Sequence, residues 1–196
     1  MIINITGIDG CGKSTQVKKL IQKLDKLGYE IYLSKAYGKE EKKVFEKLIP
    51  KFDQKAILFI FQALHVQQFN NAVEAEALKK IVVADRWDDS YLVYHSTNGV
   101  LSKKPKLREQ INDLAFKKRK ADLTFYLDVN VENIMHRLKI RGESFLEKKP
   151  AFFFETIRQA YLDLAALENW VIIDGTLSIK DISNLIFEEV NLLLKK

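Results

Sequence analysis

The chain has 196 residues, of which 47% are hydrophobic and 30% are charged, with a net charge of +6 and one cysteine. These values are typical of a globular protein and exclude a disordered chain, a disulfide framework and a multi-cysteine metal site. No apolar run approaches the roughly 20 residues that span a bilayer, and the N-terminus lacks the features of a signal peptide. We therefore expect one cytoplasmic domain over residues 1–196, without a membrane partner.

Strand and helix patterns alternate along the chain. Short apolar runs predict buried strands at residues 2–6, 29–33, 81–85, 123–129 and 170–174. Apolar residues at helical spacing predict helices at residues 13–27, 40–49, 54–79, 88–97, 105–119, 131–141, 151–168 and 178–194. This order predicts an α/β fold in which a five-stranded parallel sheet carries helices on both faces. Ligands of such sheets bind beyond the carboxyl ends of the strands.

The loop after the first predicted strand, GIDGCGKS at residues 7–14, matches the P-loop pattern G-x-x-x-x-G-K-S/T. Its glycines let backbone N–H groups curl around a phosphate, and the following helix adds positive charge at its N-terminus. Lys13 would reach the β- and γ-phosphates of ATP, and the Ser14 hydroxyl would bind Mg2+. The alternative is a glycine-rich turn that merely opens a helix. The residues expected to contact ATP here are Gly7, Gly10, Cys11, Gly12, Lys13, Ser14 and Thr15.

Two classes of P-loop protein do not fit the later strands. A GTPase would carry an N-K-x-D motif after one of them, and a motor-type ATPase would carry a strand that ends in Asp-Glu. The strands end instead in ADR, LDV and IDG.

The segment IVVADRWDDSYLVYH, residues 81–95, resembles the D-R-[YHW]-x-x-S-x-x-A-Y-Q segment of thymidylate kinases. Similar segments follow the family order along nearly the whole chain: GIDGCGKSTQ, LFIFQALHVQQ, ADLTFYLDV, RLKIRGE and IIDG. The resemblance implies the P-loop fold of the nucleoside monophosphate kinases. It also implies Mg2+-dependent transfer of the γ-phosphate of ATP to dTMP or a related pyrimidine nucleoside monophosphate, by a homodimer.

The resemblance further implies which residues hold the acceptor. It places Arg86 on the acceptor phosphate, Asp85 on Mg2+ through water, and Asp9 on the sugar 3′-hydroxyl. The implied acceptor set is Asp9, Lys39, Phe61, His65, Arg86, Ser90, Tyr94 and His95. Alternatives stay open: an ion pair of Arg86 with Asp85 or Asp88, a helix cap at Asp85, an Asp9 that is merely favoured by the turn, and a solvated Lys39.

A short lid is expected at about residues 138–152. Arg137 and Arg141 are four residues apart and share a helix face, so both can point into the donor site. The resemblance places Arg137 on ATP. Because the P-loop has Gly10 and no Arg, catalytic positive charge should come from the lid, either from Arg141 or from Lys148 and Lys149. We expect Arg141 to be the main residue that stabilises the transition state. The catalytic set is thus Lys13, Asp85, Arg86 and Arg141.

Two histidines stand at positions expected to face the acceptor base. Phe61 would stack on the base, and His65, four residues later, replaces an Arg of the family. His95 replaces the Gln of A-Y-Q. Neutral imidazole offers one donor and one acceptor, which permits a pyrimidine but weakens the case for strict dTMP specificity. Each could instead be a partly exposed histidine on a helix face.

Other functions remain as alternatives: a deoxynucleoside kinase, a nucleoside monophosphate kinase for another base, and a nucleotide-binding protein without turnover. A nucleic-acid binder would use residues 101–120, which hold eight basic and two acidic residues and so carry the whole net charge. The simpler interpretation of this segment is a solvated helix face. We therefore expect small nucleotides, and no nucleic acid, as partners.

Overall fold

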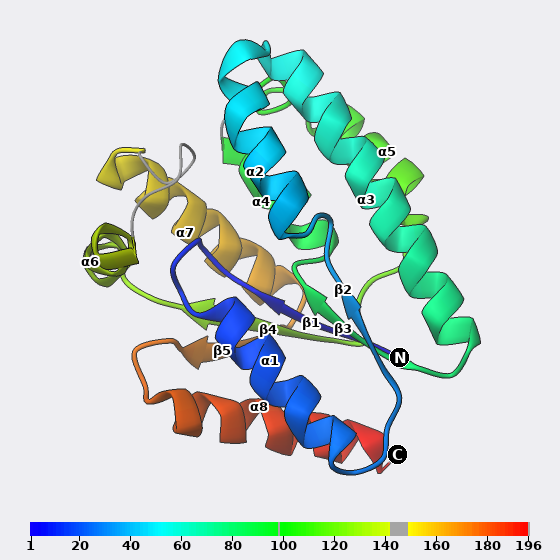
Figure 1. The fold of residues 1–196 in the computed structure, drawn as a ribbon. Helices are drawn as coiled ribbons and strands as arrows, with labels where there is room; N and C mark the ends of the chain where they lie inside the picture. Colours follow the sequence, from blue (N-terminus) through cyan, green and yellow to red (C-terminus); the bar gives the residue numbers. More distant parts are fainter. Residues whose placement is uncertain (98, 142–148, 196) are drawn as a thin grey trace.

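The computed structural model describes residues 1–97, 99–141 and 149–195, with side chains for all of these except residues 39, 42, 46 and 141. A parallel sheet lies at its centre in the strand order β2-β3-β1-β4-β5 (Figure 1). The strands are β1 (Ile2–Thr6), β2 (Ile31–Ser34), β3 (Ile81–Asp85), β4 (Leu123–Asp128) and β5 (Val171–Asp174). The predicted five-stranded parallel α/β fold is confirmed.

Helices cover both faces of the sheet, as predicted. They are α1 (Lys13–Asp25), α2 (Lys39–Leu48), α3 (Gln54–Ala77), α4 (Asp88–Thr97), α5 (Pro105–Phe116), α6 (Val131–Arg141), α7 (Ala151–Leu167) and α8 (Ile179–Leu194), with a 3-10 turn at Ile49–Lys51. Helix α1 packs against α8 on one face, and α4 packs against α5 and α7 on the other (Figure 1). Among the described residues no helix is both long enough and apolar enough to cross a membrane.

The boundaries differ from the predictions where the backbone turns left-handed. Helix α5 ends at Phe116 rather than at residue 119, because Lys117 and Lys118 have φ angles of 48° and 60°. Helix α1 ends before Leu27, and Gly28 turns the chain at a φ of 83°. Apolar periodicity runs past such points because it does not register backbone handedness.

A buried carboxylate fastens α4 to the central strand. Asn4 of β1 donates to Asp89 across 2.7 Å, and Thr6 donates to the other carboxylate oxygen. The Trp87 backbone N–H also donates to Asp89, at 3.0 Å, and the Trp87 side chain is fully buried. Because a buried carboxylate is costly unless hydrogen-bonded, this cluster sets the position of the β3–α4 turn and of Arg86 within it.

The basic segment is partly neutralised from within the fold. Arg119 pairs with Glu76 and Asp122, at 2.7 and 2.9 Å. Lys120 pairs with Asp88 and Glu168, at 2.6 and 2.9 Å. Lys118 lies 3.7 Å from Asp113. Further lysines of the segment, at residues 103, 104, 106 and 117, are exposed. Three of the eight basic residues of the segment therefore take part in ion pairs among the described residues.

Candidate active site

The P-loop lies at the carboxyl end of β1 and leads into α1. Gly12 is the residue before α1, with a φ of 106°, and a Cβ there would meet nothing within 4 Å. This open, left-handed position is where a phosphate can approach the backbone. Lys13 is only 6% exposed, and its ammonium donates to the Ile8 carbonyl across 2.9 Å. Folded back over the loop in this way, Lys13 places its charge beside the P-loop backbone.

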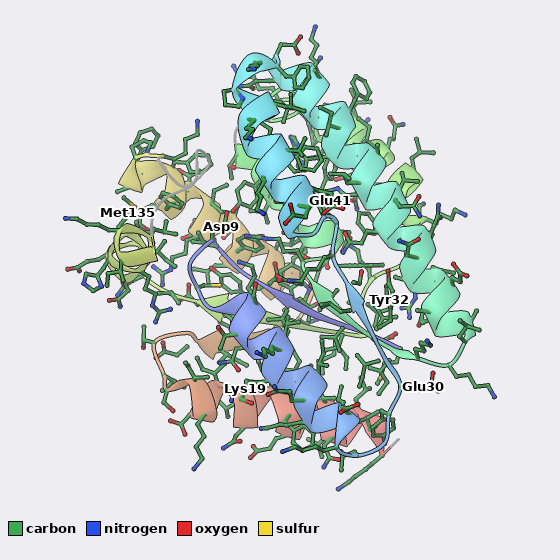
Figure 2. All side chains as sticks on the ribbon, viewed as in Figure 1. Asp9, Lys19, Glu30, Tyr32, Glu41 and Met135 are labelled. Atoms are coloured by element: carbon green, nitrogen blue, oxygen red, sulfur yellow. The ribbon has the colours of Figure 1, made fainter. Side chains whose placement is uncertain are left out.

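One carboxylate oxygen lies next to two cations that the sequence assigned to different substrates. Asp9 Oδ1 lies 3.9 Å from Lys13 Nζ and 2.7 Å from Arg86 Nη2. Figure 2 shows Asp9 between Met135 of α6 and Glu41 of α2, at the end of the sheet opposite Glu30. The donor-side Lys and the acceptor-side Arg are therefore neighbours across a single side chain.

The environment of Asp9 keeps it ionised. Burial acts to raise its pKa, but the charges of Arg86 and Lys13 and the hydrogen bonds from Arg86 and Tyr94 bring that pKa well below its usual range. Tyr94 donates to Asp9 Oδ2 at 3.2 Å. Burial, followed by the Asp9 charge, raises the pKa of Tyr94, so this hydroxyl stays protonated and remains a donor.

Arg86 is held on both sides of its guanidinium. Nη2 contacts Asp9, while Nη1 donates to Ser90 at 3.0 Å and to the Tyr161 hydroxyl at 2.7 Å. The Tyr94 ring also lies 5.5 Å from the guanidinium carbon. The Arg86 backbone has a φ of 75°, a strained conformation for a non-glycine residue that is enriched at functional sites. These contacts bring together the predicted residues Asp9, Arg86, Ser90 and Tyr94.

The alternative ion pairs for Arg86 do not occur within the described part of the chain. Asp85 pairs with Lys35 at 2.9 Å, and Asp88 pairs with Lys120. Burial, opposed mainly by Lys120, raises the pKa of Asp88 to about 6. Arg86 is therefore paired with Asp9 of the P-loop, which places its charge beside that loop.

The residues expected to hold Mg2+ lie together and fit the ion. Strands β1 and β3 are neighbours, with Asp85 beside Ile5, so Asp85 ends next to the P-loop. The Ser14 hydroxyl donates to Asp85 Oδ2 across 2.8 Å. Burial acts to raise the pKa of Asp85, but Lys13, Lys35 and Ser14 outweigh this effect. The pKa is therefore lowered, and the carboxylate is charged. A hydroxyl and a carboxylate beside a phosphate site are ligands that Mg2+ prefers.

Lys35 is a residue that the sequence analysis missed. It follows the last residue of β2 directly, at the same edge of the sheet as the P-loop, and its ammonium contacts the Asp85 carboxylate. The available signal was its place at the carboxyl end of a parallel strand, which applies equally to Lys39. The Lys39 side chain lies outside the described residues, so its assignment stays a prediction.

Arg137 contacts the P-loop backbone. Its two amino groups donate to the Cys11 carbonyl at 3.3 Å and to the Gly175 carbonyl at 3.0 Å. It thereby joins the P-loop to the turn after β5, on either side of the expected donor site. The Arg141 side chain and residues 142–148 of the expected lid lie outside the described residues, so the role of Arg141 stays a prediction.

Phe61 lies in an aromatic cluster that the sequence did not reveal. Its ring centre is 6.0 Å from that of Tyr37, in the β2–α2 loop, and 6.3 Å from that of Phe45 on α2. Tyr37 and Phe45 are themselves 5.7 Å apart, edge to face. The cluster forms an apolar aromatic surface of the kind on which a flat base can stack; stacking on Phe61 stays a prediction.

The two base-side histidines meet around a tyrosine. His65 is 8% exposed and lies 6.2 Å from Tyr91 and 5.6 Å from Phe116, by ring centres. His95 lies 4.8 Å from the same Tyr91. Burial lowers the pKa of each histidine to about 4, so both are neutral at pH 7. The alternative of a partly exposed residue is wrong for His65, which is buried where α3, α4 and α5 meet; base contact remains a prediction.

Comparison with known proteins gives one consistent result. A family model described as thymidylate kinase matches residues 5–186. A thymidylate kinase of Fervidobacterium nodosum is 36% identical over 97% of this chain and 98% of its own length. Thymidylate kinases of Thermosipho africanus and Caldanaerobacter subterraneus are 32% and 30% identical, over 100% and 98% of this chain and 98% and 96% of their own lengths.

Proposed function

The chain belongs to the thymidylate kinase family, and on this premise we propose that it transfers the γ-phosphate of ATP to dTMP, or to a related pyrimidine nucleoside monophosphate. The observation that carries the proposal is the single carboxylate oxygen of Asp9 beside both Lys13 and Arg86. A cation for the donor and a cation for the acceptor, this close together, suit two phosphates that must meet.

The transfer needs little covalent chemistry from the protein. An oxygen of the acceptor phosphate attacks the γ-phosphorus, the bond from that phosphorus to the β–γ bridging oxygen breaks, and ADP leaves. Lys13 neutralises charge on the donor, and Arg86 holds the acceptor in line through a planar, permanently charged group. Ser14 would hold Mg2+ directly and Asp85 through water. When bound, the ion neutralises phosphate charge.

The acceptor nucleoside would lie between Phe61 and α4. Phe61 would stack on the base, Asp9 would accept from the sugar hydroxyl, and His65 and His95 would set the base preference. Replacing His65 with Ala should raise the KM for dTMP far more than the KM for ATP, which steady-state kinetics can measure. Equal effects on both constants would contradict the assignment to the base.

The central test is ADP formation from ATP and Mg2+ with a panel of nucleosides, ribonucleotides and deoxynucleotides as acceptors. We expect turnover with dTMP and none with thymidine. Turnover on thymidine alone would instead indicate a deoxynucleoside kinase, and no turnover on any acceptor would refute the kinase assignment.

Arg141 is proposed to supply the missing positive charge from the lid, at about residues 138–152 of a single domain. Arg141→Ala should lower kcat about 100-fold, the cost of removing one transition-state donor. Lys139→Ala is the matched control, because Lys139 is an exposed cation on the same helix. An Arg141→Ala enzyme that keeps most of its kcat would overturn the proposal.

We also propose a cytoplasmic homodimer that pairs through α3. Six residues at alternating spacings of four and three face solvent on this helix: Phe59, Ala63, Val66, Asn70, Val73 and Ala77. Phe59 is 69% exposed, and this spacing is that of paired helices. Phe59→Glu should shift the sedimentation coefficient from dimer to monomer, whereas Leu114→Glu, at an exposed apolar position on α5, should not. A monomeric wild-type protein at micromolar concentration would refute the interface.

A further inference from the structure

Among the described residues, Tyr161 is the residue of α7 that contacts Arg86. Its side chain is fully buried, and its hydroxyl accepts from Arg86 Nη1 across 2.7 Å. The same hydroxyl lies 3.0 Å from Ser90 Oγ. The Tyr161 ring stacks on Tyr126 of β4, with centres 5.2 Å apart and planes within 16°. A residue that the motifs did not single out thus reaches the acceptor side of the site.

The contact matters because Arg86 has a competing partner. Asp9 attracts Nη2, and without other partners the Arg86 guanidinium would rotate toward the Asp9 carboxylate. The bonds of Nη1 to Tyr161 and Ser90 oppose that rotation. Hydrogen bonds among the described residues use three of the five Arg86 N–H groups, which leaves two for the oxygens of a phosphate.

The contact also links two parts of the molecule. Helix α7 begins at Ala151, immediately after the segment that joins it to α6, and it packs against α4 and α6 (Figure 1). Arg86 lies in the turn before α4. A shift of α7 relative to α4 would therefore change the distance from the Tyr161 hydroxyl to Arg86, whereas the contacts of the guanidinium with Asp9 and Ser90 involve no residue of α7.

We propose that Tyr161 is a positioning residue: its hydroxyl holds Arg86 in the orientation that receives the acceptor phosphate, and so makes that orientation depend on the placement of α7. The inference rests on the proposed function for the identity of the acceptor. It goes further in assigning phosphate affinity to a residue that does not itself contact the phosphate.

The test compares two buried tyrosines of one stacked pair. Tyr161→Phe removes the hydroxyl from Arg86, and Tyr126→Phe removes a hydroxyl that donates to Asp128 at 3.2 Å. Calorimetric titration of the nucleotide-free proteins would use dTMP, thymidine and inorganic phosphate. We expect Tyr161→Phe to weaken dTMP about tenfold, as loss of a hydrogen bond to a charged group implies, and to leave thymidine unchanged. Tyr126→Phe should alter neither.

Two further variants separate positioning from general stability. With Arg86→Ala in the background, Tyr161→Phe should have no additional effect on dTMP, because the residue acts through Arg86. Tyr161→4-aminophenylalanine keeps a polar atom for Ser90 but accepts poorly from Arg86, so it should reproduce the loss in dTMP affinity even if Tyr161→Phe folds poorly.

Equal weakening of thymidine and dTMP, an equal effect of Tyr126→Phe, or a full effect in the Arg86→Ala background would each overturn the inference. Failure of the proposed function looks different. If the wild type binds phosphate but not dTMP, the acceptor is misidentified, and a selective loss of phosphate binding in Tyr161→Phe still supports the role of Tyr161. If the wild type binds neither, both proposals fall.

Discussion

Two regions of this molecule differ in whether their polar groups have hydrogen-bond or ion-pair partners. At the carboxyl end of the sheet, Asp9 contacts Lys13, Arg86 and Tyr94. Asp85 contacts Lys35 and Ser14. In the interior between α3, α4 and α5, buried polar atoms lack hydrogen-bond partners within the described residues; they belong to Gln62, His65, Tyr91 and Arg108. The first region keeps its charges by pairing them, whereas in the second the histidines lose theirs.

The difference bears on where a phosphate could bind under the proposed function. Arg86 has two N–H groups beyond those bonded to described residues, so it could contact a phosphate without giving up its pair with Asp9. A neutral imidazole offers no such charge, and it suits a neutral base or bound water instead. Under the proposed function, phosphate handling and base recognition would be separated by electrostatics as well as by position along α4.

The largest loss of activity is expected when Lys13 is removed from the charged region. Lys13→Ala should lower kcat about 1,000-fold or more, because it deletes a preorganised cation from the transferring phosphates. Lys18→Ala, an exposed lysine one turn along α1, serves as the control and should leave kcat within twofold. Comparable losses in both variants, with unchanged thermal stability, would show that Lys13 is not part of the catalytic machinery.

The neutral region should make the protein sensitive to acid. Burial lowers the pKa of His65 to about 4 in the folded protein from its ordinary value of 6.5, so the unfolded chain binds the proton first as pH falls. The stability that neutral His65 contributes is present above pH 6.5 and is lost progressively toward pH 4. By linkage the loss is about 2 kcal/mol between pH 7.5 and 5.0.

Urea unfolding at these two pH values would measure that loss. His65→Leu should remove the share that His65 contributes and leave the share of His95, whose pKa is also lowered to about 4. His136→Leu, at an exposed position on α6, should keep both. The raised pKa of Asp88 acts in the opposite direction over part of this range, because the folded state there binds the proton more tightly. The informative quantity is therefore the difference between wild type and variant. An identical pH dependence in wild type and His65→Leu would contradict the assignment.

A smaller effect would sharpen the comparison at Lys35. Its ammonium lies 2.9 Å from the Asp85 carboxylate, which is expected to bind Mg2+ through water. Lys35 and the metal ion would therefore repel each other and compete for the same carboxylate. Lys35→Met should reduce the Mg2+ concentration needed for half-maximal turnover by about threefold, an effect that added salt should diminish. An increased Mg2+ requirement would show instead that Lys35 supports the metal.

The helices, strands and P-loop were predictable from sequence patterns, whereas the contacts between residues far apart along the chain were not. Short apolar runs, helical spacing and the P-loop motif located every strand and helix to within a few residues, because they report the periodicity of burial. The Asp9–Arg86 contact was beyond reach, since it joins residues far apart along the chain. Tyr161 illustrates the same limit, because nothing in its local pattern separates it from an ordinary core residue of α7.

Cys11 offers a way to measure local opening of the P-loop. It is the only cysteine of the chain, and its thiol is buried beneath the loop, where a Cβ on Gly7 would come within 2.8 Å of the sulfur. Because the thiol is buried, a thiol reagent needs a local opening to reach it, and the rate of alkylation would report that opening. Slower labelling with ATP present would report nucleotide binding in the native, unmodified sequence, without any engineered probe.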